Sequence, residues 1–152
     1  MLYQGLVTGL VGAAIVAMSF LLADMAAGTP LHTASALGSA LLLGAAGPNE
    51  VELNAGVITA YSVLHLVTFS MIGIGFAWLA HRVEGTPEFG LRAFGLLLLL
   101  EGLFLGTVGM ISGWIVEELG WLTILASNAA AVLGMAMWLW RSRPELREAI
   151  QS

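Results

Sequence analysis

The chain has 152 residues, of which 59% are hydrophobic and only 10% are charged, and its formal net charge is −5. A soluble domain usually carries about 25% charged residues, so most of the surface of this chain is expected to face hydrocarbon. All five basic residues are arginine and form no cluster for nucleic acid. The lack of cysteine excludes disulfides, thiolate metal sites and a cysteine nucleophile.

A membrane-spanning helix needs about 20 mostly apolar residues, and four segments meet this requirement. In chain order they are residues 3–23, 55–80, 91–115 and 121–140. No basic residue precedes the first segment and no clear cleavage site follows it, so we expect a retained helix rather than a signal peptide. The sequence therefore predicts an all-α polytopic membrane protein that forms one four-helix bundle over residues 1–152.

The segment between the first two spans has a different character. Pro30 precedes it, and Gly44, Gly47 and Pro48 end it, which predicts a short helix over about 33–44. Such a helix is too short to cross a bilayer, so it is expected either to lie in the outer interface or to be re-entrant. Thr33 or Ser35 is expected to cap its start.

The arginines predict the orientation of the bundle. Arg82 and Arg92 flank the loop between the second and third spans, and the other three arginines follow the fourth span. In a four-span bundle all five lie on one side, which the positive-inside rule makes cytoplasmic, together with both termini. The tryptophans, which favour the two interfaces, divide in the same way into an inner set, Trp78, Trp138 and Trp140, and an outer set, Trp114 and Trp121.

Small residues recur at helical spacing on three of the spans. Because apolar side chains gain little by leaving lipid, helices in membranes associate where small residues let their backbones approach closely. These stripes therefore predict close helix contacts, either within one chain or between chains. Their members are Gly5, Gly9 and Gly12 on the first span, Gly102, Gly106, Gly109 and Gly113 on the third, and Ala126, Ala130 and Gly134 on the fourth.

The run FLLADMAAGTPLHTASALGSALLLG, followed by a span that contains YSVLHLVTF, resembles a group of small four-helix bacterial membrane proteins. The resemblance implies the same four-span architecture and a place in the bacterial inner membrane. The group brings no established activity, so the resemblance implies no site residues.

Glu101 stands in the leucine-rich run LLLLLEGLFLG, nine residues after Arg92 and thus about 13 Å into the hydrocarbon. An ionisable residue at such depth is a candidate proton or cation site. The favoured interpretation is a neutral carboxylic acid that bonds to a neighbouring helix, with Ser70 near its level, and a contact with a partner subunit or lipid also stays open.

His65 lies 17 residues before Arg82, roughly 25 Å from the inner side and near the level of Asn128. A neutral imidazole is a good axial ligand, so haem or chlorophyll at His65 is one hypothesis. A bis-histidine haem would need a second histidine, and only His32 could approach. The favoured interpretation is a histidine bonded to a serine, threonine or asparagine of an adjacent helix.

The outer face also carries oxygen and nitrogen groups that could bind a divalent cation. These residues do not have the spacing of a metal site, so we expect them to be solvated instead. The four metal candidates are Asp24, His32, Glu50 and Glu52.

Three function classes follow from these features. The favoured one is a non-catalytic membrane subunit or accessory protein that packs, through small-residue faces, against other membrane subunits or against itself. The alternatives are a small oligomeric transporter or proton conduit that uses Glu101, and a haem- or pigment-binding subunit that uses His65. An intramembrane enzyme is a fourth and less favoured class, because the chain has no nucleophile elbow, phosphate loop or zinc-protease motif.

Overall fold

The computed structural model describes residues 1–85 and 113–143 of the chain. This part is helical and contains no strand, which confirms the predicted all-helical class for the residues described. Three of its helices are long and apolar enough to cross a membrane: α1 (Leu2–Ala26), α3 (Ala55–Gly85) and α6 (Trp121–Ser142). They cover the spans predicted at 3–23, 55–80 and 121–140. The span predicted at 91–115 lies outside the described residues except for its last three.

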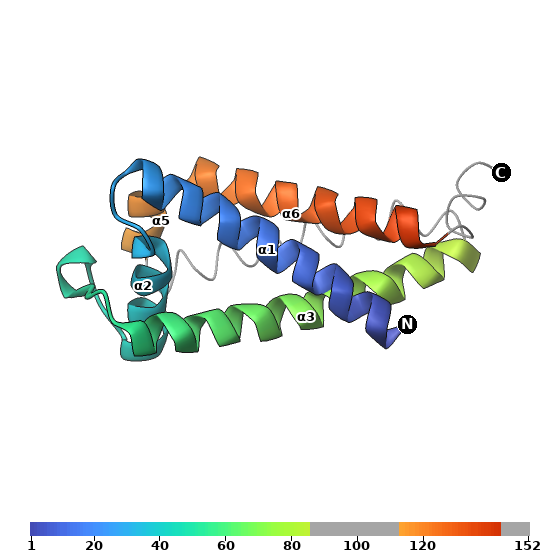
Figure 1. Cartoon of the computed structure of the whole chain (residues 1–152), viewed down its shortest axis with the longest axis horizontal. Helices are drawn as coiled ribbons and strands as arrows, with labels where there is room; N and C mark the ends of the chain where they lie inside the picture. Colours follow the sequence, from blue (N-terminus) through green and yellow to red (C-terminus); the bar gives the residue numbers. More distant parts are fainter. Residues whose placement is uncertain (86–112, 144–152) are drawn as a thin grey trace.

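Shorter elements gather at the end of the bundle that lies away from the N-terminus (Figure 1). Helix α2 (His32–Gly38) continues into a π-helical turn (Ser39–Leu43), and a 3-10 turn (Pro48–Glu50) precedes α3. Helix α5 (Gly113–Leu119) is joined to α6 by Gly120 alone. The φ angle of Gly120 is +74°, a positive value that glycine adopts without steric cost, so the chain can change direction between the two helices within one residue.

Helix α1 lies between α3 and α6 and packs against both (Figure 1). Its contact with α3 is a backbone-to-backbone approach. A Cβ atom on Gly9 would lie 2.2 Å from the carbonyl oxygen of Phe69, and one on Gly73 would lie 2.2 Å from the backbone nitrogen of Gly9. No side chain fits between the helices here, so the glycines of the first span make the close contact that their spacing predicts. Their partner, Gly73, belongs to no predicted stripe.

The contact between α1 and α6 involves mainly a row of α6 residues next to the small-residue stripe, and the structure does not test whether that stripe contacts another chain. The buried residues of α6 are Ile124, Ser127, Ala131, Met135 and Leu139. Gly134 of the predicted stripe does meet Ile15 of α1, but Ala126 and Ala130 are exposed. Two adjacent rows of α6 contain small residues, and spacing alone cannot tell which row turns toward α1.

The described arginines gather at one end of the bundle. Helices α3 and α6 both end close to the N-terminus, which places Arg82, Arg141 and Arg143 at that end (Figure 1). The guanidinium of Arg82 lies 5.0 Å from the centre of the Trp78 ring, a cation–π contact. Arg92 and Arg147 lie outside the described residues.

Candidate functional site

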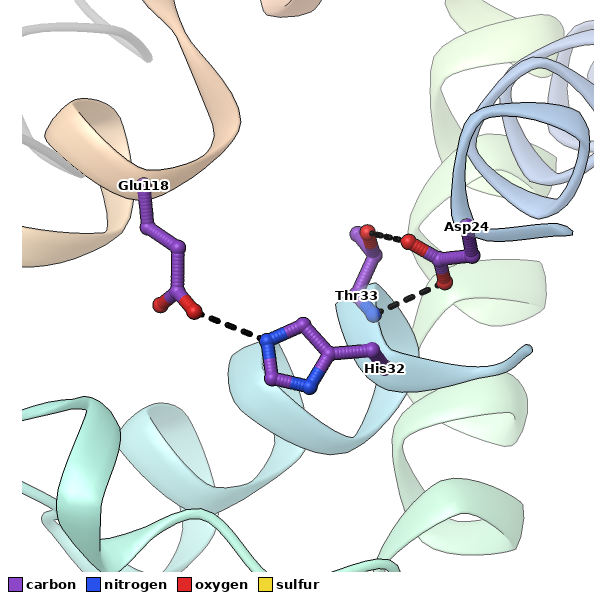
Figure 2. A network of polar contacts seen from close by, with 4 residues as sticks. All are labelled: Asp24, His32, Thr33 and Glu118. Atoms are coloured by element: carbon purple, nitrogen blue, oxygen red, sulfur yellow. Dashed lines mark hydrogen bonds and ion pairs between the residues drawn. The ribbon is translucent and has the colours of Figure 1, made fainter. Parts of the chain in front are cut away.

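A carboxylate of α1 caps helix α2 at the end of the bundle away from the termini. Asp24 accepts two hydrogen bonds from Thr33, one from the backbone N–H at 2.9 Å and one from the hydroxyl at 2.6 Å (Figure 2). The side chain at the N-cap position, Leu31, makes no capping bond. The prediction that Thr33 or Ser35 caps this helix was therefore wrong: Asp24, nine residues before Thr33, supplies the acceptor from another helix.

Further polar contacts join α2 to the elements around it. His32 Nε2 lies 2.8 Å from Glu118 Oε1 of α5, across 86 residues of sequence (Figure 2). The Ser35 hydroxyl donates to the backbone carbonyl of Glu52, just before α3. These bonds hold α2 across the ends of the long helices.

The four metal candidates do not converge on one point. Asp24 bonds to Thr33 and His32 to Glu118, while Glu50 accepts a hydrogen bond from the backbone N–H of Ala46 at 2.9 Å. Glu52 is exposed. Residues 1–85 and 113–143 contain no group of three histidines or carboxylates able to hold a metal ion.

His65 faces α1 from the middle of α3. Its Nε2 lies 3.2 Å from the carbonyl oxygen of Ala13, and because a carbonyl only accepts, Nε2 must carry the proton. The ring lies between Tyr61 and Phe69, with centroid distances of 6.0 and 4.6 Å. The partner is thus on an adjacent helix, as expected, but it is a main-chain carbonyl rather than a hydroxyl or an amide.

Two of the other candidates predicted to lie within the membrane, Ser70 and Asn128, belong to the described residues. Ser70 donates to the carbonyl of Leu66, one turn earlier in its own helix, at 2.7 Å. Asn128 is partly buried on α6. Glu101 lies outside the described residues.

A cavity of about 430 Å³ opens between α1, α2 and α3. Its walls are mostly aliphatic, with Leu10, Ala14 and Ala17 from α1 among them. Polar and aromatic groups also line it, and several of them are the residues described above: Asp24, Phe20, Thr33, Tyr61, Ser62 and His65. Sequence reasoning chose Asp24 and His65 separately. It missed Tyr61 and the cavity itself, because no periodicity reveals a gap between three helices.

The cavity is elongated and carries its charge at one end. It follows α1 from Leu10 to Asp24, 14 residues or about 21 Å of helix. Asp24 lies at the end next to α2, and its residue exposure is 7%. Of the described residues that line the cavity, Asp24 alone is a carboxylate and none is arginine.

Comparisons with protein-family models, with curated proteins and with solved structures found no match to this chain. The role of the candidate site is therefore inferred from its geometry alone, and the resemblance to small bacterial four-helix proteins stays a prediction from the sequence.

Proposed function

We propose that this protein is a non-catalytic subunit or accessory protein of the bacterial inner membrane, with four spanning helices and both termini in the cytoplasm. The observation that carries the proposal is the use of polar side chains at the α2 end of the bundle. Asp24, His32 and Ser35 each join α2 to another element. A catalytic site needs several polar groups directed at a substrate, whereas each of these bonds to another part of the protein and holds α2 in place.

The exposed faces of the long helices support a role in assembly. On α6 the exposed residues include a run of small side chains beside large apolar ones: Ala126, Ala129, Ala130, Leu133 and Met137. A small-residue face that does not pack against the described part of its own chain can take up a helix of another subunit or a second copy.

The arginines support the orientation. Arg82, Arg141 and Arg143 lie at the same end of the bundle as the N-terminus, and the positive-inside rule assigns this end to the cytoplasm. On this assignment α2 lies at the outer surface.

Native mass spectrometry of protein extracted in mild detergent tests the assembly. We expect a species heavier than one chain, which Ala130→Trp on α6 should dissociate because the indole blocks close helix approach. Ala60→Trp, at an exposed alanine of α3, is the matched control and should leave the species intact. A single-chain species from the wild-type protein would contradict the proposal, and proton flux through that species in liposomes would favour a conduit instead.

Orientation needs its own test, and the natural lack of cysteine makes it simple. Cysteines placed at Asn49 and Ser142 should react with a membrane-impermeant reagent from opposite faces of the membrane. Reaction of both from the same face would overturn the four-span topology.

A further inference from the structure

We propose that the cavity between α1, α2 and α3 binds a single-chain cationic amphiphile, with Asp24 as the counter-ion of its head group. This inference goes beyond the proposed function, because a ligand site in the purified chain does not depend on whether the chain assembles with others.

The size and lining of the cavity suit a small ligand. Ligand pockets usually measure about 300–1,000 Å³ and combine apolar walls with a few polar groups, and this cavity of about 430 Å³ does the same. Its apolar wall runs along α1 for about 21 Å. A hydrocarbon tail fits this shape better than a compact polar molecule.

The charge of the head group follows from Asp24. Its carboxylate is buried, and within the described residues it accepts hydrogen bonds from Thr33 but forms no ion pair. An ionised carboxylate has about four lone-pair sites, of which these bonds occupy two. A buried negative charge without a cationic partner favours a positively charged ligand and disfavours an anionic one.

Aromatic side chains that line the cavity favour the same sign of charge on the ligand. Phe20 lies one helical turn before Asp24 on the same face of α1, and both line the cavity with Tyr61 of α3. The faces of aromatic rings attract ammonium groups, including quaternary ones.

The direction of the cavity matches the way an amphiphile lies in a bilayer. Asp24 is near the end of α1, where the polar contacts of α2 begin, whereas Leu10 lies in the apolar interior of the helix. A head group at Asp24 therefore leaves the tail parallel to α1 and directed toward the middle of the membrane.

The binding of radiolabelled dodecyltrimethylammonium to purified protein in uncharged maltoside micelles tests the proposal, with protein-free micelles as the background. We expect saturable binding that unlabelled dodecyltrimethylammonium displaces and that dodecanol and dodecyl sulfate displace poorly. Equal displacement by dodecanol would overturn the proposal and make the cavity a groove for neutral lipid chains.

Variants locate the binding. Asp24→Asn keeps an acceptor for Thr33 but removes the charge, so affinity should fall at least about tenfold. Glu118→Gln, a carboxylate change at the same end of the bundle but outside the cavity lining, should leave affinity unchanged. Equal affinity in wild-type protein and a folded Asp24→Asn variant would overturn the assignment of Asp24.

A second pair of variants does not alter the capping of α2. Ala14→Phe places a ring in the cavity wall and should abolish saturable binding. Ala23→Phe, at an exposed alanine of the same helix that does not line the cavity, should bind like the wild type. Unchanged binding by Ala14→Phe would show that the amphiphile binds elsewhere and would overturn the proposal.

Discussion

The two ends of the bundle are held by different kinds of contact. Toward the termini, α1 and α3 approach backbone to backbone at Gly5, Gly9 and Gly73. At the other end, the helices diverge enough to leave a cavity, and side-chain hydrogen bonds from Asp24 and His32 hold α2 in place. The first contact depends on the absence of side chains, and the second depends on particular polar atoms. Added side-chain volume should therefore destabilise the end toward the termini, whereas loss of a polar atom should destabilise the other end.

The glycine contact should be the most sensitive to added volume. Gly9→Ala should reduce the free energy of unfolding by about 1–3 kcal/mol, since the new methyl would meet the backbone of Phe69, which cannot rotate away. Gly9→Leu should prevent the α1–α3 contact altogether. Unfolding by sodium dodecyl sulfate in mixed micelles, followed by circular dichroism, measures both effects.

Gly75 is the matched control for this prediction. It lies on α3 two residues after Gly73, and a Cβ there would meet nothing within 4 Å. Gly75→Ala should therefore change stability by less than about 1 kcal/mol, the size of the helix-propensity difference. Equal losses at Gly9 and Gly75 would mean that the close approach of α1 and α3 does not stabilise the fold.

At the polar end, loss of the cap should have the next largest effect. Asp24→Ala removes the acceptor of two bonds to Thr33 and should cost about 0.5–2 kcal/mol, as other capping residues do. Asp24→Asn should cost less, because the amide oxygen still accepts one of them. The same unfolding assay ranks the two variants. An equal loss of unfolding free energy in both would mean that the charge of Asp24, and not its hydrogen bonds to Thr33, stabilises the fold.

Substitutions of Glu101 test whether a polar group that the sequence places within the membrane also contributes to stability. From the sequence we predict that its side chain is neutral and bonded to a protein acceptor. Glu101→Leu should therefore cost about 1 kcal/mol, the scale of hydrogen bonds in membranes, and Glu101→Gln almost nothing. Unfolding in mixed micelles measures both. A stable Glu101→Gln variant that abolishes proton flux in liposomes would contradict this structural role and favour the conduit.

The sequence predicted the glycine contact between α1 and α3 better than the polar contacts of α2, and the reason is physical. Apolar length identified the three long apolar helices of the described residues, and the glycine spacing of α1 identified the face that meets α3, because both signals can be read along a single helix. Gly73, Tyr61 and Glu118 were missed as partners, since each becomes important only through a contact with a distant part of the chain. Asp24 was noticed as a charge, but its role as the cap of α2 depends on how the turn after α1 folds back.

The contact between His32 of α2 and Glu118 of α5 should have the smallest effect of the contacts compared here. The side chains of His32 and Glu118 are 30% and 26% exposed, so water and salt screen their attraction. A double-mutant cycle with His32→Ala and Glu118→Ala should give a coupling energy of about 0.2–1 kcal/mol, typical of exposed pairs. At a pH low enough to protonate His32, this coupling should shrink when the salt concentration is raised, because screening grows with ionic strength, whereas the effect of Gly9→Ala should not change. A coupling energy above about 2 kcal/mol that is insensitive to salt would contradict this comparison, and would mean that α2 is held as firmly to α5 as α1 is to α3.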